Sequence, residues 1–485
     1  MTIKDLQPRE IWHYFEEITQ VPRPSKKEEK ISAFLKHFAS EHKLGFRTDE
    51  TGNIIIEKAA TKGYESMPKV ALQSHIDMVC EKNNDVEHNF ETDPIKTKVD
   101  GEWLKAQGTT LGADNGIGVA AQLAVLASTD IPHGALECLF TVDEETGLTG
   151  AFGLKPDFLT SKILLNLDSE DEAELYIGCA GGIDSTVMLE YKTIPATSEL
   201  FYFRVDVKGL NGGHSGDDIN KGFANANKLL AEFLQLCNND FGLTLVEIGG
   251  GNLHNAIPRE AFAVCGVPYA EKESVRVALN IYLAELAETY EKSEPKLRID
   301  LHSESAPVKV IEQSISDKLI AALVACPNGV IAMSDVMPGL VQTSTNLASV
   351  KMLPNHVIKV VTSQRSSVEV EKYEIANRVE AIFKSIGAKV THGDGYPGWA
   401  PNPDSEILKV AAKTHVDLFG FEPKIKAIHA GLECGLFLAK YPDLDMVSFG
   451  PTMRGVHSPD ERLHIPSVEK FWNHLLLILK NIPTK

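Results

Sequence analysis

Five short segments of the sequence carry imidazole and carboxylate side chains that can bind metal ions. In the absence of thiolates, such groups suit zinc, manganese or cobalt at a catalytic site better than at a closed structural site. If the fold gathers them, they can hold two divalent ions that activate a water molecule, which is the chemistry of a hydrolase. The residues are His75, Asp77, Asp114, Glu144, Glu145, Asp168 and His457.

Two metal ions need a carboxylate that bridges them, and Asp114 is the expected bridge. It follows a glycine-containing segment, residues 108–112, and precedes an apolar run with helical character at residues 116–126. The amino end of a helix carries partial positive charge, which favours a carboxylate there. We therefore expect two divalent ions per chain, zinc first, with manganese or cobalt able to replace it.

His75 and Asp77 follow a short apolar run, residues 70–74, that predicts a strand. Residues two apart on a strand point to the same face, so one can bind a metal while the other orients it. A carboxylate that accepts the second N–H of a ligating imidazole fixes its orientation and raises its basicity. Asp77 is therefore expected to support His75 rather than to bind a metal.

Further acidic residues follow two other apolar runs. Glu144 and Glu145 come after residues 136–142, and Asp168 comes after residues 163–167. Ligands of an open α/β sheet bind beyond the carboxyl ends of its strands, so these side chains are expected at one edge. Adjacent residues of an extended segment point in opposite directions, so one glutamate should reach a metal and the other the water. The spacing does not say which.

Taken together, these segments resemble a known family. Ser-His-Ile-Asp-Met-Val (74–79), Leu-Gly-Ala-Asp-Asn-Gly (111–116), Asp-Glu-Glu-Thr-Gly (143–147), Asn-Leu-Asp-Ser-Glu (166–170) and Val-His-Ser-Pro-Asp-Glu (456–461) closely resemble motifs of the bacterial aminoacyl-histidine (Xaa-His) dipeptidases. This family belongs to a wider clan of dimetal aminopeptidases, carboxypeptidases, deacylases and carnosinases. The resemblance extends along the whole chain, through residues 212–216, 255–259 and 429–435.

The resemblance implies an arrangement of the metal ligands. His75 and Asp168 would hold one metal, Glu145 and His457 would hold the other, and Asp114 would bridge the two.

It also implies roles for the remaining groups of the site. Glu144 would be the general base, and Asp77 would contribute to catalysis; neither would be a main metal ligand. The peptide bond between Asp114 and Asn115 is expected to be cis, as in the related enzymes.

Three residues between the metal-binding segments are expected to contact the substrate. By resemblance, His214 would polarise the scissile carbonyl or stabilise the oxyanion, and Asn255 and Arg365 would hold the substrate. A guanidinium is physically suited to the terminal carboxylate of a peptide. His429 stays undecided, because its segment could form a wall of the substrate pocket or simply a tight strand-to-helix turn.

The implied activity is metal-dependent hydrolysis of unblocked dipeptides, including Xaa-His and β-alanyl-histidine. An N-acyl amino acid deacylase or a carboxypeptidase would need the same metals and base. A scaffold protein that has lost catalysis is a further alternative, although Glu144 and every candidate ligand are present. Isolated acidic residues are usually solvated turn residues or helix caps, so the conjunction of five compatible motifs carries the hypothesis.

Composition limits the partners and the location. The formal net charge of −19 argues against nucleic acid and anionic membranes, because both bind basic surfaces. The first residues show no signal-peptide pattern, and no segment reaches the roughly 20 apolar residues that span a bilayer. We expect a cytoplasmic protein whose partner is a small peptide substrate, and the resemblance adds an expected homodimer.

The length of 485 residues favours two domains. We expect an α/β catalytic domain with a mostly parallel central sheet flanked by helices, built from residues 1–186 and 400–485. An inserted α+β lid or dimerisation domain would occupy residues 187–399. Ser25 and Glu28 form a capping-box pattern ahead of an early surface helix.

Overall fold

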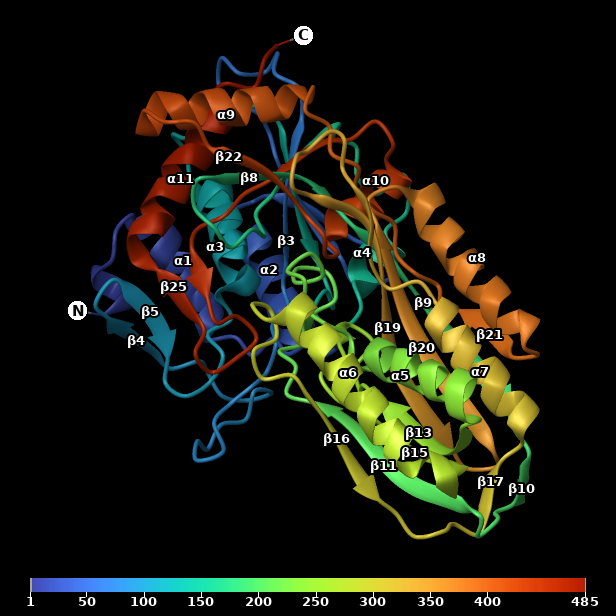
Figure 1. Ribbon diagram of the computed structural model, residues 1–485. Helices are drawn as coiled ribbons and strands as arrows, with labels where there is room; N and C mark the ends of the chain where they lie inside the picture. Colours follow the sequence, from blue (N-terminus) through green and yellow to red (C-terminus); the bar gives the residue numbers. More distant parts are fainter. Residues whose placement is uncertain (1, 485) are drawn as a thin grey trace. The chain divides into compact units, whose positions relative to one another are not determined.

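The computed structural model describes residues 2–484, which form two compact units (Figure 1). The first unit comprises the chain up to residue 178, residues 401–427 and the chain from residue 432; the second comprises residues 179–400 and 428–431. The boundary falls before residue 181 because strand β9 (Gly181–Glu190) pairs with strands of the second unit. A lid or dimerisation role for the second unit stays a prediction.

The first unit contains an eight-stranded sheet in the order β1-β2-β6-β3-β7-β23-β8-β22. Its four central strands, from β6 to β23, are parallel, whereas β1 and β2 at one side, and β8 beyond β23, pair in antiparallel fashion. The predicted α/β class is confirmed, with a parallel centre in a mixed sheet. The strands are β1 (Gly45–Thr48), β2 (Ile54–Lys58), β3 (Val70–His75), β6 (Leu136–Thr141), β7 (Ile163–Asn166), β8 (Glu174–Cys179), β22 (Lys424–Ile428) and β23 (Asp445–Ser448).

Helices accompany the central strands of this sheet. Every residue of β3 and β6 is buried, as expected for parallel strands that are covered on both faces. The helices of the first unit are α1 (Arg9–Thr19), α2 (Glu29–Glu41), α3 (Ala113–Ala127), α4 (Thr149–Gly153), α9 (Glu406–Phe419), α10 (Glu433–Lys440) and α11 (Ile465–Lys480). None of the helices in the described residues is both long enough and apolar enough to cross a membrane.

The predicted capping box at the start of α2 is wrong. Glu28, not Ser25, is the residue that precedes the helix, and it makes no side-chain cap. The Ser25 hydroxyl instead donates to Asp77 Oδ2 at 2.8 Å, and Glu28 Oε1 accepts from the backbone N–H of Asp143 at 3.0 Å. Both residues contact buried groups of the sheet edge, which the local sequence pattern does not reveal.

A four-stranded antiparallel sheet, β24-β25-β5-β4, also belongs to the first unit. Its strands are β4 (Thr97–Asp100), β5 (Trp103–Ala106), β24 (Met453–Arg454) and β25 (Arg462–His464). Strands β24 and β25 form a hairpin, so the loop of residues 455–461 has both its ends fixed by this sheet.

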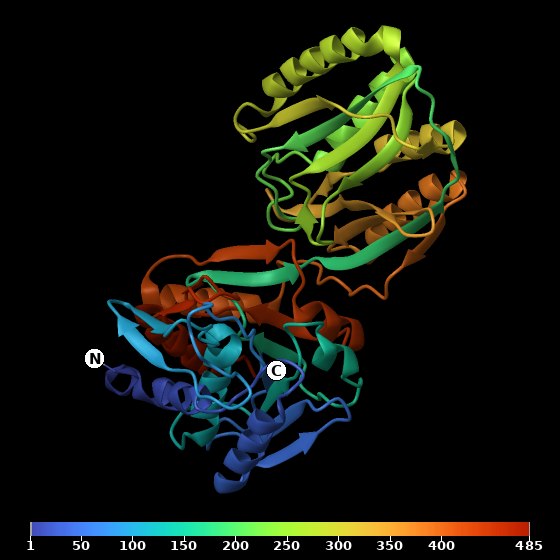
Figure 2. The same cartoon turned by 90° about the horizontal axis from the view of Figure 1, so that it is seen from below.

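The second unit contains an antiparallel sheet in the order β16-β11-β15-β13-β19-β20-β9-β21, with β18 paired to β19. Helices lie along one face of it (Figures 1 and 2), and their apolar side chains share one core with the sheet. The elements are β11 (Leu200–Lys208), β13 (Thr244–Gly250), β15 (Ala261–Pro268), β16 (Arg298–Ser303), β18 (Gly329–Met333), β19 (Val341–Leu353), β20 (Val357–Ser366), β21 (Lys389–His392), α5 (Ala226–Phe241), α6 (Lys272–Tyr290), α7 (Gln313–Ala325) and α8 (Glu369–Ser385), with short ladders β10–β17 (Thr193–Pro195, Lys309–Ile311) and β12–β14 (Gly213–His214, Ala256–Ile257).

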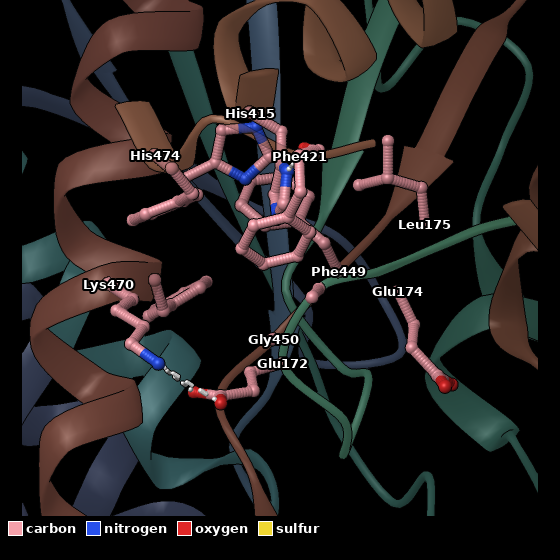
Figure 3. A pocket seen from close by; sticks show the side chains of 12 residues that line it. Glu172, Glu174, Leu175, His415, Phe421, Phe449, Gly450, Lys470 and His474 are labelled. Atoms are coloured by element: carbon pink, nitrogen blue, oxygen red, sulfur yellow. Dashed lines mark hydrogen bonds and ion pairs between the residues drawn. The ribbon is translucent and has the colours of Figure 1, made fainter. Parts of the chain in front are cut away.

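A small aromatic cavity of about 50 Å³ lies in the first unit, and none of the predicted metal ligands is among its lining residues (Figure 3). Two imidazoles line it with ring centroids 5.4 Å apart: His415 donates to the carbonyl of Phe421 at 3.0 Å, and His474 donates to that of Ala411 at 2.8 Å. At its edge Lys470 pairs with Glu172 at 3.1 Å. Burial lowers the pKa of His474 to about 4, so this histidine is neutral in the folded protein.

The neutral state of His474 predicts a pH dependence of stability. An unfolded histidine has a pKa near 6.5, so the unfolded chain binds the proton more tightly, and the free energy of unfolding should fall as the pH falls from 6.5 towards 4. We expect His474 to contribute a loss of about 2 kcal/mol between pH 7 and pH 5. Urea denaturation of the chelator-treated protein should show a smaller loss for His474→Gln than for the wild type. The exposed His37→Gln serves as control, and equal losses in the two variants would contradict the prediction.

Candidate metal centre

The carboxylate of Asp114 lies between two histidines that are far apart in the sequence. Its Oδ1 is 3.0 Å from His75 Nε2, and its Oδ2 is 3.1 Å from His457 Nε2. Each oxygen therefore faces a different imidazole, which is the geometry that a bridging ligand requires.

One further carboxylate lies beside each histidine. Asp168 Oδ1 is 3.5 Å from His75 Nε2, and Glu145 Oε2 is 2.9 Å from His457 Nε2. The side chains of His75 and Glu145 are almost fully buried, whereas that of His457 is 53% exposed. The structure thus brings together the five residues that the sequence predicts as ligands, and it gives the centre one solvent-facing side.

Strand register explains how three of these residues meet. His75 is the last residue of β3 and lies opposite Thr141 at the end of β6, four residues before Glu145. Gln73 of the same strand lies opposite Asn166 at the end of β7, two residues before Asp168. Since the strands are parallel, their carboxyl ends deliver side chains to one edge, as the sequence predicts.

Asp114 reaches this edge from the start of helix α3. The backbone is not helical at Asp114 and Asn115, and the peptide bond between them is cis, which confirms the expectation. The helix lies close to the strands at Gly118, where an added Cβ would come within 2.5 Å of Ser74 Oγ and 2.9 Å of the Leu167 carbonyl oxygen. A glycine at this position therefore lets the Asp114 segment approach β3 and the end of β7.

Asp77 is fully buried behind His75. Its Oδ1 is 3.3 Å from His75 Nδ1, the nitrogen on the side opposite Asp114. It also accepts the backbone N–H groups of Glu144, at 3.0 Å, and Glu145, at 3.2 Å. One carboxylate therefore orients the imidazole and holds the segment that carries both glutamates.

The centre is strongly polarised. Hydrogen bonds with Asp114 and Glu145 raise the pKa of His457 to about 11, against the opposing effect of burial. Burial disfavours charge on His75, but Asp168, Asp114 and Asp77 outweigh it and raise its pKa well above the usual range. Burial would raise the pKa of Asp114, yet its contacts with both histidines hold it well below the usual range.

Glu144 differs from its neighbour, because no ion pair or hydrogen bond of its carboxylate is found within the described residues. Burial raises its pKa well above the usual range, His75 opposes this rise, and Glu433 and Glu145 add to it. Burial therefore makes this carboxyl group bind a proton more readily than an exposed glutamate does.

These residues fit divalent metal ions. Asp168 Oδ1 and Glu145 Oε1 are buried and have no hydrogen-bond partner among residues 2–484, although each carboxylate lies beside a histidine. Ligand atoms of His75, Asp114 and Glu145 lie within 4.8 Å of one another. Buried carboxylates outnumber the imidazoles here, and such a set is stable only when cations compensate its charge.

A second acidic group, Glu28, Asp77 and Asp143, lies nearby but has other partners. Asp77 and Glu28 accept backbone N–H groups, and Asp143 accepts the hydroxyls of Thr146 and Thr149. These bonds account for the acidic residues without a metal ion.

Glu433 lies in the motif of residues 429–435, but the sequence alone indicates no role for it. It is 1% exposed, and its Oε2 accepts from Gln73 Nε2 at 2.6 Å and from Thr141 Oγ1 at 2.9 Å. Gln73 in turn accepts from Asn166 at 2.5 Å, so a buried polar chain joins the ends of β6, β3 and β7. Burial raises the pKa of Glu433 to about 7.

Two other unassigned residues hold the segment of Asp114. Glu461, in the motif that carries His457, accepts backbone N–H groups of residues 111–114. Arg23 is buried and donates to the carbonyl oxygens of Gly112 and, at 2.8 Å, of Asp77. The resemblance of the motif to a known family was the only sequence signal for Glu461, and Arg23 had none.

The predicted substrate residues lie in the second unit. His214 is in strand β12, its Nδ1 is 3.3 Å from Asp217 Oδ2, and Asn255 lies just before β14. Arg365, in β20, is 6% exposed. It donates to the Tyr396 hydroxyl at 3.0 Å, and its Nε has no hydrogen-bond partner within the part of the chain that the structure describes.

His429, which the sequence left undecided, also belongs to the second unit. Its Nε2 lies 2.7 Å from Ser344 Oγ. Burial lowers its pKa to about 4, and the charge of Arg365 acts in the same direction. His429 is therefore a buried, neutral partner of Ser344 rather than a charged group.

Comparison with known proteins defines the class of this chain. The model of peptidase family M20/M25/M40 matches residues 71–481, and the chain belongs to this family. It is 44% identical to the cytosol non-specific dipeptidase of Escherichia coli (strain K12), over 100% of this chain and 99% of the relative. Aminoacylhistidine dipeptidase from Vibrio alginolyticus matches with a TM-score of 0.95 and 42% identity, covering 100% of this chain and 99% of that one. The resemblance to aminoacyl-histidine dipeptidases is thereby confirmed.

A more distant structure shares the fold. Human carnosine dipeptidase 1 matches with a TM-score of 0.51 and 13% identity, covering 97% of this chain and 95% of that one.

The close approach at Gly118 predicts an unusual effect of alanine. In an ordinary helix interior, Gly→Ala stabilises by about 0.5–1 kcal/mol. At position 118 the methyl group would press on the Leu167 carbonyl and on Ser74, and we expect a net destabilisation of about 1–3 kcal/mol. Urea denaturation of the metal-free protein measures the change, and an increase in the free energy of unfolding would show that the contact is not restrictive.

Proposed function

We propose that this chain is a cytoplasmic dipeptidase that hydrolyses the peptide bond of unblocked dipeptides with two bound divalent metal ions. The observation that carries the proposal is the Asp114 carboxylate, with one oxygen directed at His75 and the other at His457. The dipeptidases of Escherichia coli and Vibrio alginolyticus, similar over their whole length, support the substrate class. The name of the former also supports the cytoplasmic location.

The metal ions would be held by two sets of ligands. His75 and Asp168 would bind one ion, Glu145 and His457 the other, and Asp114 both, in keeping with the pairs of neighbours in the centre. Zinc fits imidazole and carboxylate ligands, and manganese or cobalt can replace it. When bound, such ions lower the pKa of water and polarise the scissile carbonyl.

Glu144 would act as the general base. It would take a proton from the attacking water and return it to the departing amine, since no hydrogen bond or ion pair within residues 2–484 engages its carboxylate. Asp77 would assist by orienting His75 and by holding the backbone of Glu144.

Residues of the second unit would hold the substrate. We assign the terminal carboxylate of the dipeptide to Arg365, because it is buried and its Nε donor has no partner among the described residues. His214 would stabilise the oxyanion, and Asn255 would bind the substrate backbone. A preference that includes Xaa-His and β-alanyl-histidine, and assembly as a homodimer, belong to the same proposal.

A substrate panel separates this function from its alternatives. We expect the zinc, manganese or cobalt enzyme to cleave β-alanyl-histidine and several α-dipeptides, and to lose this activity with a chelator. A tripeptide and an N-acetylated dipeptide should react poorly. Faster cleavage of the acetylated compound would identify a deacylase, and the absence of turnover with every metal would favour a scaffold protein.

The division of labour between Glu144 and Glu145 is tested by isosteric substitutions. Glu144→Gln should keep both metal ions and lose activity about a hundredfold or more, because a proton acceptor is removed. Glu145→Gln should lose one metal ion, because a ligand is weakened. Metal content by elemental analysis, together with dipeptide hydrolysis, provides the measurement. Equal metal loss in the two variants would contradict the assignment.

A further inference from the structure

Glu461 lies in the same loop as His457, and its side chain contacts the backbone segment that contains Asp114. It is 2% exposed and comes four residues after His457, just before strand β25. Its partners are some 350 positions away in the sequence. A buried carboxylate is costly unless hydrogen bonds or opposite charges compensate its negative charge, so its partners indicate the role of the glutamate.

The partners are four successive backbone N–H groups. Glu461 Oε2 accepts from Leu111 at 2.6 Å and Gly112 at 2.9 Å; Oε1 accepts from Ala113 at 2.7 Å and Asp114 at 3.3 Å. The two oxygens of one carboxylate therefore bind the backbone that leads into the bridging aspartate and the N–H of that aspartate itself.

The loop that presents Glu461 is itself held in place. Strands β24 and β25 pair at both ends of it, Ser458 Oγ donates to the Gly455 carbonyl at 2.6 Å, and the Glu461 N–H donates to the Ser458 carbonyl at 3.0 Å. The same loop contacts the Asp114 segment twice, through His457 on the carboxylate and through Glu461 on the backbone.

We infer that Glu461 is a positioning residue that fixes the backbone of Asp114 relative to His457, and so pre-organises the bridging carboxylate for two metal ions. The inference rests on the proposed two-metal function. The partners of the Glu461 carboxylate are backbone N–H groups, so it acts on the segment from which Asp114 projects.

The role requires a carboxylate rather than any polar side chain. A carboxylate has two oxygens and can accept all four N–H groups, and its charge strengthens each bond. A glutamine has one carbonyl oxygen, so its NH₂ group would face two of the donors. Glu461→Gln should leave part of the segment unsatisfied and free to shift, although the side chain keeps its size.

The test measures metal binding directly. Wild type, Glu461→Gln and Glu461→Asp are stripped of metal, and the Kd for Zn²⁺ is measured by chelator competition. The absorption spectrum of the Co²⁺ form reports ligand geometry. We expect Glu461→Gln to bind Zn²⁺ about 10- to 100-fold more weakly and to alter the Co²⁺ spectrum, which is the usual cost of removing a group that orients a ligand. Glu461→Asp keeps the charge but is shorter, and should show an intermediate loss.

A matched control separates positioning from general stability. Glu294 is 3% exposed and accepts the backbone N–H groups of Asn211 at 2.7 Å and Ala224 at 3.0 Å, in the second unit. Glu294→Gln should lower the thermal stability of the metal-free protein to a similar extent and leave the Zn²⁺ Kd and the Co²⁺ spectrum unchanged.

The outcomes are distinct. Unchanged Zn²⁺ affinity and Co²⁺ spectrum in Glu461→Gln, or equal changes in Glu294→Gln, would overturn the inference. If Glu461→Gln does not fold, the same readouts on Glu461→Asp decide, and wild-type behaviour there would also overturn it. A wild type that fails to bind two metal ions would refute the proposed function itself.

Discussion

The shared carboxylate of Asp114 is the contact on which the rest of the centre depends. It faces two histidines that lie 39 positions before it and 343 positions after it, so no local segment can create this geometry. The parallel centre of the sheet places His75, the irregular start of α3 places Asp114, and the β24–β25 hairpin places His457. Each of these elements is an ordinary strand, helix or hairpin, but the three side chains come together only when the whole first unit is folded.

Much of this centre could be predicted from the sequence because the pattern of apolar residues indicates where strands end. Apolar runs followed by acidic residues or histidine identified three segments of the first unit, and the resemblance supplied His457 and the cis bond after Asp114. The capping-box prediction failed because Ser25 finds a buried carboxylate, Asp77, which is a stronger partner than a helix end. Glu461 could not be assigned because its partners are backbone N–H groups, which no side-chain pattern marks.

The antiparallel strands at the edges of the sheet could not be predicted from the sequence either. The sequence identifies apolar strands and their order along the chain, but pairing direction depends on which distant strand lies alongside. Strand β23, which joins the sheet from the last part of the chain, lies parallel to β7 and antiparallel to β8. The buried hydrogen bonds from Glu433 to Gln73 and Thr141, and from Asn166 to Gln73, join the ends of β6, β3 and β7, so they form only when these three strands lie side by side.

The position of the β24–β25 hairpin near the end of the chain makes the centre dependent on the late part of the polypeptide. A shorter chain that ends before this hairpin still contains His75, Asp114, Glu145 and Asp168, but it lacks both His457 and the carboxylate that holds residues 111–114. An incomplete or C-terminally clipped molecule would therefore retain most of the acidic groups without the means to organise them. Tight metal uptake would then distinguish finished molecules from fragments.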